Sequence, residues 1–386
     1  MLSWNLKTTE NAQAARCARR SVLTAALKYM KKNKILISGN EAIAEAAIQA
    51  GCRFYAGYPI TPQNELTAYM SDHMPNAGGV FIQAESELAA ISMVYGAAAA
   101  GARAMTSSSS PGISLKQEGI SYIAGAQLPS VIVNIMRGGP GLGNIWPAQS
   151  DYFQAVKGGG HGDYHCIVLA PAYVQEAYDF MYSAFDLADK YRNPVIILGD
   201  GILGQMMEPV QVSGVRCQVS AYKKPWALTG CKGRPANIVK SFYMAEGDLE
   251  KANLATQKKY QAIKEAEQRY EGLFLDDAKV ILVAYGTMAR IAAGAVEALR
   301  KKGKKAGLLR PMTLWPFPDK IFKRLAAGRK RISLLTVEMS YGQMVEDVRL
   351  AVGCKLPVEF LGRAGGGIPS EEEIIKKAIR LLGKQA

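Results

Sequence analysis

The strongest constraint on the fold is an alternation of short apolar runs with helical segments, which begins at Lys34. A strand, a helix and then another strand, repeated along a chain, are typical of a parallel sheet with helices on both faces. We therefore expect a doubly wound, mostly parallel α/β domain. Its expected strands are residues 34–38, 53–58, 80–83, 103–107, 130–136, 166–170 and 194–199. Its expected helices are residues 40–50, 63–74, 86–100, 114–126 and 173–191.

The alternation stops in the middle of the chain and returns on a smaller scale. Residues 211–275 are polar and charged, and we interpret them as a linker and a charged helix. This pattern predicts a first domain over residues 34–210 and a second, smaller α/β domain over residues 276–386. The second domain has expected strands at 279–284, 305–309, 332–337 and 358–361, and expected helices at 289–302, 320–327, 343–352 and 370–382.

The net charge is concentrated in two patches. The chain has 47 Lys and Arg against 33 Asp and Glu, and the excess lies in residues 1–33 and 300–331. No nucleic-acid motif and no interleaving of aromatic with basic residues accompanies it, so we expect no nucleic-acid partner. We interpret residues 1–33 as a basic, disordered extension, with a leader peptide or a start at Met30 as alternatives. The second patch is either a solvated face or a docking surface for an acidic partner.

Other sequence features exclude several kinds of site. No uninterrupted apolar run approaches the about 18 residues of a membrane span. The six cysteines are scattered and form no C-x-x-C pair, so this chain alone should hold neither a zinc ribbon nor an iron–sulfur cluster. Free thiols of this kind fit a cytoplasmic protein. His161 and His165 could ligate a metal, but no third cluster is near, and we expect a polar turn and no metal site.

Three residues follow expected strands, where a parallel sheet presents functional groups. Thr61 lies between two prolines, and its hydroxyl could contact a ligand or cap the next helix. Glu85 precedes a very apolar helix and could be a partly desolvated, proton-exchanging carboxyl or a first-turn acid that stabilises the helix dipole. Arg137 could clamp a carboxylate or be a surface residue beside a glycine-rich loop. Together these residues describe an anion-binding edge with one carboxyl, and they do not name a reaction.

Glycine-rich residues 199–204 offer two further motifs, and both are incomplete. They fit G-x-G-x-x-G, but Pro209 follows closely and no acidic residue stands at the spacing of a dinucleotide site. Gly199-Asp200-Gly201 also resembles the start of the diphosphate–magnesium motif of thiamine enzymes. That motif ends in an Asn-Asn pair, which this chain lacks. A diphosphate-binding half is therefore missing.

Several motifs, taken together, resemble the alpha subunits of thiamine-diphosphate-dependent 2-oxoacid:ferredoxin oxidoreductases. They are Gly39-Asn40-Glu41-Ala42, Tyr58–Pro62, Gln83-Ala84-Glu85, Ser109-Ser110-Pro111-Gly112, Arg137-Gly138-Gly139-Pro140, Gly158–Tyr164 and Val337-Glu338-Met339-Ser340. The resemblance implies a first domain that binds the thiamine aminopyrimidine and a second domain similar to the C-terminal domain of transketolase. It also implies a beta subunit that holds the diphosphate with magnesium, and iron–sulfur clusters on partner subunits, with gamma and ferredoxin-like subunits in the complex.

The same resemblance implies roles for individual residues. Glu85 would hydrogen-bond the aminopyrimidine ring nitrogen and promote its imino form, which helps to create the carbon nucleophile. Thr61 would contact the substrate, and Arg137 would bind the substrate carboxylate. The expected cofactor contacts are Glu85, Pro59, Ser109 and Gly112. The implied reaction is oxidative decarboxylation of a 2-oxoacid to an acyl-coenzyme A, with electrons passed to ferredoxin.

The substrate is suggested by one region of the chain. Residues 146–153 and 158–161 are more similar to the branched-chain (3-methyl-2-oxobutanoate) group than to the 2-oxoglutarate group. The alternatives are a 2-oxoglutarate enzyme, a thiamine-dependent transferase without an electron acceptor, and a non-catalytic scaffold subunit. The presence of Thr61, Glu85 and Arg137 together favours the oxidoreductase.

Overall fold

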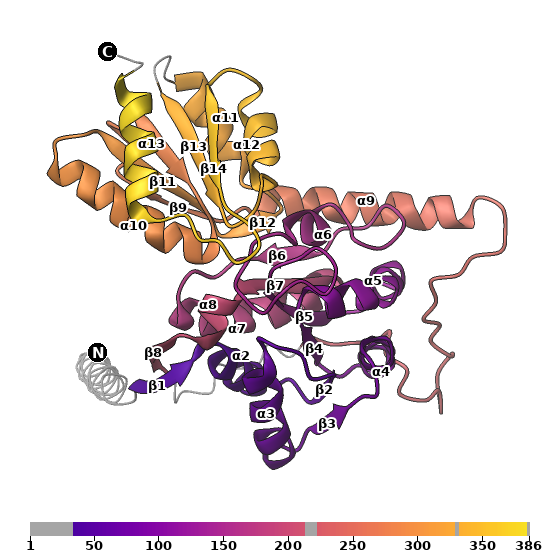
Figure 1. Cartoon of the computed structure of the whole chain (residues 1–386). Coiled ribbons are helices and arrows are strands. Elements are labelled where there is room, and N and C mark those ends of the chain that lie inside the picture. Colours follow the sequence, from indigo (N-terminus) through magenta and orange to yellow (C-terminus); the bar gives the residue numbers. More distant parts are fainter. Residues whose placement is uncertain (1–33, 213–221, 329–331, 384–386) are drawn as a thin grey trace, which may run out of the picture.

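The protein contains two large sheets and one small sheet in a computed structural model that describes residues 34–212, 222–328 and 332–383 (Figure 1). In spatial order, the seven-stranded sheet consists of β12 (Thr313–Trp315), β6 (Ile167–Leu169), β7 (Pro194–Asp200), β5 (Ser130–Met136), β4 (Ala104–Ser108), β2 (Phe54–Gly57) and β3 (Val80–Gln83). The five-stranded sheet consists of β14 (Val358–Gly362), β13 (Ser333–Glu338), β10 (Val280–Val283), β11 (Ala306–Pro311) and β9 (Tyr270–Leu273). The small sheet pairs β1 (Lys34–Ser38) with β8 (Met207–Gln211).

Helices cover both faces of the seven-stranded sheet. Strands β2 to β7 run parallel, and parallel strands are joined by right-handed crossovers. This handedness places α2, α3 and α7 on one face of the sheet and α4 and α5 on the other. The helix contacts agree, because α2 packs on α3 and α7, and α4 packs on α5. These helices are α2 (Gly39–Gln49), α3 (Asn64–His73), α4 (Glu87–Ala99), α5 (Ser110–Gly125) and α7 (Val174–Tyr191). The expected doubly wound, mostly parallel α/β fold is confirmed.

The core explains which strands are central. Every residue of β5 is buried, as a strand with helices on both faces requires, whereas β3 at the edge has no buried residue. Short elements connect the main ones: η1 (Pro75–Ala77), α6 (Tyr152–Val156) and α8 (Gly201–Gln205).

The five-stranded sheet also carries two helix layers (Figure 1). Helix α10 packs on α13, and α11 packs on α12. Their bounds are α10 (Gly286–Lys301), α11 (Asp319–Gly328), α12 (Met344–Val352) and α13 (Glu371–Gly383). Within the described residues, none of the helices is long and apolar enough to cross a membrane.

Four strands depart from the expected arrangement. Strands β8 and β9 were not expected, and β9 lies in the residues that we interpreted as a linker and a charged helix, yet it pairs antiparallel with β11. Strand β1 forms where we expected it, but it pairs antiparallel with β8 and does not join the parallel sheet. Strand β12 was not expected at all; it follows β11 along the chain, yet it pairs antiparallel with β6 of the other sheet. Both pairings join segments far apart in the sequence, and a local hydrophobic pattern carries no information about such pairings.

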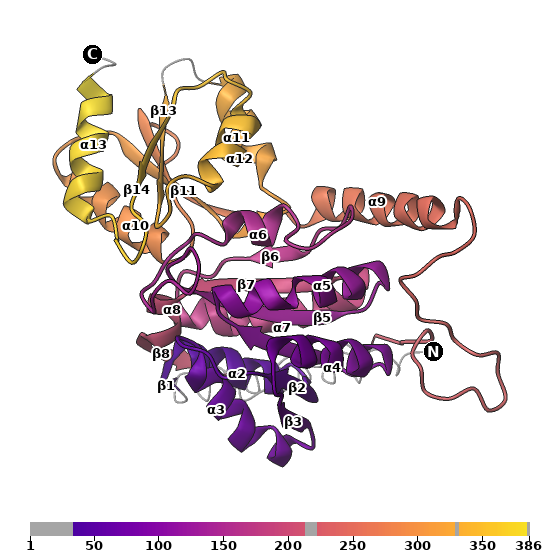
Figure 2. The same cartoon turned by 45° about the vertical axis from the view of Figure 1, so that its right-hand side comes forward.

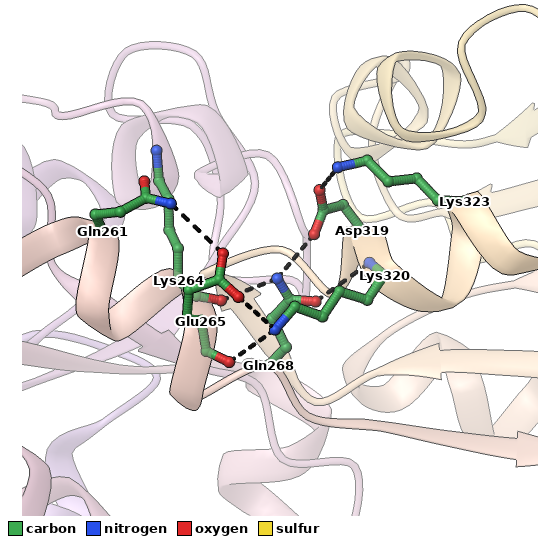
Figure 3. Close-up of polar contacts among 7 residues, drawn as sticks. All are labelled: Gln261, Lys264, Glu265, Gln268, Asp319, Lys320 and Lys323. Carbon is green, nitrogen blue, oxygen red and sulfur yellow. Dashed lines mark hydrogen bonds and ion pairs between the residues drawn. The ribbon is translucent and has the colours of Figure 1, made fainter.

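Helix α9 (Asp248–Ala266) crosses from one sheet to the other, and Figure 3 shows the polar contacts at its end. Lys320 Nζ lies 2.8 Å from the Glu265 carbonyl oxygen and 2.8 Å from Glu265 Oε2. The Gln268 side-chain amide donates to Asp319 Oδ1 over 2.8 Å. These contacts fix the end of α9 to α11. Only Tyr260 and Ile263 of α9 are buried, so most of this charged helix faces solvent.

Candidate active site

Four loops meet at the carboxyl edge of the seven-stranded sheet, after β2, β3, β4 and β5. The crossover from β2 leads to β3 on one side, and the crossover from β4 leads to β5 on the other, although β2 and β4 are neighbours. In open α/β sheets, ligands bind in the crevice at such a switch point. The sequence-predicted residues Thr61, Glu85, Ser109 and Arg137 lie in these four loops.

Thr61 and Arg137 are in direct contact. Arg137 Nη1 donates to the Thr61 carbonyl oxygen over 3.1 Å, and Nη2 donates to the Leu142 carbonyl oxygen over 3.0 Å. Arg137 is only 7% exposed, so the alternative of an ordinary surface arginine is wrong. Its Nε is buried and has no hydrogen-bond partner among the described residues. Two of the five guanidinium N–H groups thus hold Arg137 in place, and the other three have no partner among the described residues.

The Thr61 side chain is free of a capping role. Helix α3 begins at Asn64 and its N-cap residue is Gln63, so the alternative that Thr61 caps this helix is wrong. Its hydroxyl accepts a 3.3 Å hydrogen bond from Asn64 Nδ2. The hydroxyl proton of Thr61 is thus available to a ligand.

Glu85 is exposed in this chain, which differs from the partial desolvation expected for it. The reason is its position: α4 buries Ala90, Ile91 and Val94 along its length, whereas Glu85 precedes the N-cap Ser86 and projects beyond the packed part of the helix. The first-turn acid of α4 is Glu87, so the helix-dipole alternative for Glu85 is also wrong. The Glu85 carboxyl is therefore open to a molecule that covers this edge.

The loop between β4 and α5 places buried hydroxyls at the same edge. Ser109 is the N-cap of α5, and the hydroxyls of Ser108 and Ser109 are buried without a hydrogen-bond partner among the described residues. A Cβ at Gly112 would lie 2.1 Å from Ser108 Oγ and 2.6 Å from Glu87 Oε1, so only glycine fits there. Of the expected cofactor contacts, Pro59 is exposed, whereas Gly112 is buried behind the loop.

A buried lysine behind this loop escaped the sequence analysis. Lys116 is fully buried, and its Nζ donates to Thr106 Oγ1 over 2.7 Å and to the Ser107 carbonyl oxygen over 3.2 Å. Burial lowers the pKa of Lys116 to about 7, and the nearby Glu87 carboxylate opposes this shift. Gln117 and Glu118 follow Lys116 directly, so nothing in the local sequence marks this lysine as buried. Lys116 therefore holds the end of β4 through its bonds to Thr106 and Ser107.

The segment after Arg137 joins the two sheets through Gln149. Its Nε2 donates to the Tyr285 carbonyl oxygen over 2.9 Å, and its Oε1 accepts from the Met339 N–H over 3.1 Å. The Gln149 N–H also donates to the Met339 carbonyl oxygen over 2.8 Å. Gln149 is fully buried. The motif at 146–153 thus anchors the loop that carries Arg137 to the second α/β unit.

The motif at Glu338 performs a similar structural role. Its carboxylate accepts N–H groups from residues 343, 344 and 345 at the start of α12 over 3.0–3.1 Å. Burial raises the pKa of Glu338, and these backbone donors oppose the rise. Glu338 therefore holds the loop between β13 and α12.

The remaining motifs are structural. Asp200 of the Gly199–Gly201 motif caps the five-residue helix α8 by accepting from the N–H groups of Ile202 and Leu203. His165 stacks on Trp315 with ring centroids 4.6 Å apart, and His161 lies edge-on to Tyr122. Among the residues that the structure describes, no group of three or more His, Cys, Asp or Glu side chains could hold a metal ion.

The edge offers the groups that an aminopyrimidine and a 2-oxoacid require. An exposed carboxyl stands at Glu85, unpartnered hydroxyls stand at Ser108 and Ser109, and an unpartnered cationic donor stands at Arg137. A ring nitrogen can bond to the first, and a carboxylate to the last. The residues present therefore fit the aminopyrimidine part of thiamine diphosphate.

Comparison with known proteins agrees with this geometry. The family model described as pyruvate flavodoxin/ferredoxin oxidoreductase, thiamine diphosphate-binding, matches residues 45–272. The model of the pyruvate:ferredoxin oxidoreductase core domain II matches residues 278–374. The fold and site thus define a thiamine-diphosphate-binding α/β enzyme. Within that class, the chain belongs to the pyruvate flavodoxin/ferredoxin oxidoreductase family and is an oxidoreductase subunit, so the resemblance seen in the sequence is confirmed.

Individual relatives extend this result. The chain is 51% identical over 349 residues to the ketoisovalerate oxidoreductase subunit VorB of Methanothermobacter marburgensis, covering 90% of this chain and 98% of the relative. It is 36% identical to the 2-oxoglutarate synthase subunit KorA of Methanothermobacter thermautotrophicus, covering 89% and 98%. The 2-oxoglutarate:ferredoxin oxidoreductase of Magnetococcus marinus superposes with a TM-score of 0.79 at 26% identity, covering 91% of this chain and 66% of that longer chain.

Proposed function

We propose that this chain is the alpha subunit of a branched-chain 2-oxoacid:ferredoxin oxidoreductase and that its substrate is 3-methyl-2-oxobutanoate. The observation that carries the proposal is the contact of Arg137 with the Thr61 loop at the switch point of the sheet. The substrate assignment is supported by the higher identity to the ketoisovalerate relative than to the 2-oxoglutarate relative.

Each residue then has a chemical task. When bound, thiamine diphosphate supplies the carbon nucleophile and the electron sink for decarboxylation. The Glu85 carboxyl holds and exchanges a proton at the aminopyrimidine ring nitrogen. The unused N–H groups of Arg137 bind the substrate carboxylate, and the Thr61 hydroxyl donates to a substrate oxygen. Because Arg137 is already held by two carbonyl groups, it is oriented before the substrate arrives.

The partner subunits complete the site in this proposal. A beta subunit holds the diphosphate with magnesium and covers the exposed Glu85. Iron–sulfur clusters on partner subunits pass electrons to ferredoxin, and coenzyme A accepts the acyl group. Pro59 and Ser109 contact the cofactor from this side, and Gly112 makes room for Ser108 and Glu87 behind them.

The test uses the assembled complex and a panel of 2-oxoacids. The expected result is that kcat/KM for coenzyme A-dependent viologen reduction is highest with 3-methyl-2-oxobutanoate. A higher kcat/KM with 2-oxoglutarate would refute the substrate assignment. An absence of turnover with every 2-oxoacid, in a complex that binds thiamine diphosphate, would refute the catalytic role and favour a scaffold subunit.

A further inference from the structure

One exposed segment between the two α/β units has the pattern of a strand without a sheet. In residues 237–244, half-buried side chains alternate with exposed ones, although the segment forms no helix or strand. A period of two is the side-chain period of an extended chain. Figures 1 and 2 show this part of the chain as an open trace that leads up to α9.

The outward row of this segment is mostly apolar, with Lys240 as its charged member. Ile238 is 80% exposed, Phe242 is 73% exposed and Met244 is 83% exposed. Soluble proteins rarely gather large apolar side chains in solvent unless another molecule covers them. The inward side is occupied, because Val239 packs against the core and Ser241 Cβ approaches the end of α5 at Gly125. The segment is thus held against the body by one side only.

The backbone of the segment is also unpaired. Among the described residues, the N–H and C=O groups of residues 238–244 take part in no hydrogen bond. Beside the segment lies a pocket of about 480 Å³, lined by Tyr122 of α5, Phe242, Tyr243 and Leu249 of α9. Free main-chain groups, an alternating apolar row and an adjoining pocket are the features by which an extended segment adds to the sheet edge of another protein.

The charge around the segment indicates the kind of partner that would bind it. Residues 222–247 contain five Lys or Arg against one Glu. A second copy of this chain would bring like charges together, which is unfavourable at an interface. An acidic chain of a different kind would be attracted. We propose that residues 238–244 dock as an added strand on an acidic partner subunit, with Phe242 and Met244 as anchors.

This inference deepens the proposed function, because it takes the partner to be another subunit of the same oxidoreductase. Hydrogen exchange tests it in the assembled complex and in the free full-length chain. The amides of residues 238–244 should exchange at least about tenfold more slowly in the complex, since an added strand hydrogen-bonds them. Equal exchange rates in the two states would overturn the proposal.

A variant pair provides the second test. Phe242→Asp combined with Met244→Asp should weaken association with the partner subunits at least about tenfold, since central apolar anchors dominate interfaces. Leu350→Asp, at a 78% exposed leucine on α12, is the matched control and should leave the affinity within threefold. The thermal unfolding of the free chain should not change in either variant. Equal affinities of the double variant and the control would refute the docking role.

Two further results separate the possible errors. If the wild-type chain alone forms a dimer that Phe242→Asp abolishes, the occupant is a second copy and the choice of an acidic partner is wrong. If the complex protects residues 238–244 but oxidises no 2-oxoacid, the proposed function fails and the docking strand stands. If the complex oxidises 2-oxoacids while the amides of residues 238–244 exchange freely, the proposed function stands and the docking strand is wrong.

Discussion

Substitution of Glu85 by glutamine should separate catalysis from folding. The side chain is exposed in this chain and precedes the N-cap of α4, so neither packing nor a helix cap depends on its charge. We therefore expect the free energy of unfolding to change by less than about 0.5 kcal/mol, as for other surface substitutions. Loss of a proton-exchanging carboxyl should lower kcat about 10²- to 10⁴-fold. That range corresponds to about 2.7–5.4 kcal/mol of activation free energy.

The assay is coenzyme A-dependent viologen reduction by the assembled complex, with urea unfolding measured on the same preparations. Glu87→Gln is the matched control, because Glu87 is buried at the start of α4 and supports the charge of Lys116. It should lower the free energy of unfolding by about 1–3 kcal/mol, the cost of a disturbed buried polar group. If Glu85→Gln turns over at the wild-type rate, Glu85 does not exchange the cofactor proton and its assignment is wrong.

Three further predictions concern the residues around it. Arg137→Lys should raise KM for the 2-oxoacid at least about tenfold with a smaller effect on kcat. The reason is that lysine lacks the planar guanidinium that the Thr61 and Leu142 carbonyl groups hold. An unchanged KM in steady-state kinetics of the complex would show that Arg137 binds no carboxylate. Gly112→Ala should lower the free energy of unfolding by about 1–3 kcal/mol, because the new Cβ would stand 2.1 Å from Ser108 Oγ. Gly383→Ala is the control, because a Cβ there meets nothing within 4 Å. Equal melting temperatures for the two variants would contradict the packing argument. The free energy of unfolding should rise as the pH increases from about 7 towards the ordinary lysine pKa of 10.5, because in this window the unfolded state binds a proton that buried Lys116 has released. Lys116→Met should remove this rise in urea unfolding measured at several pH values, and the same slope in the variant would assign it to another group.

The local pattern of the sequence was sufficient for most elements of the fold. Strands such as β5 are continuous apolar runs, and helices such as α7 bury one regular face, so each can be recognised without its neighbours. The local pattern did not predict the order of the strands in the sheets. Strand β12 is three residues long and joins the sheet through β6, a partner far away in the sequence. A short run of this kind has no period to recognise, and its pairing depends on where the rest of the chain has already packed.

The candidate site shows the same division. Chain order and residue type were enough to select Thr61, Glu85 and Arg137, because functional groups on a parallel sheet follow the ends of its strands. Burial was not available from the sequence, since it depends on every element that packs around a side chain. The folded chain alone shows that Arg137 is enclosed while Glu85 is open, and it reveals the buried pair of Lys116 and Glu87. Exposure and the free donors of a site are properties of packing, and packing exists only once distant segments have come together.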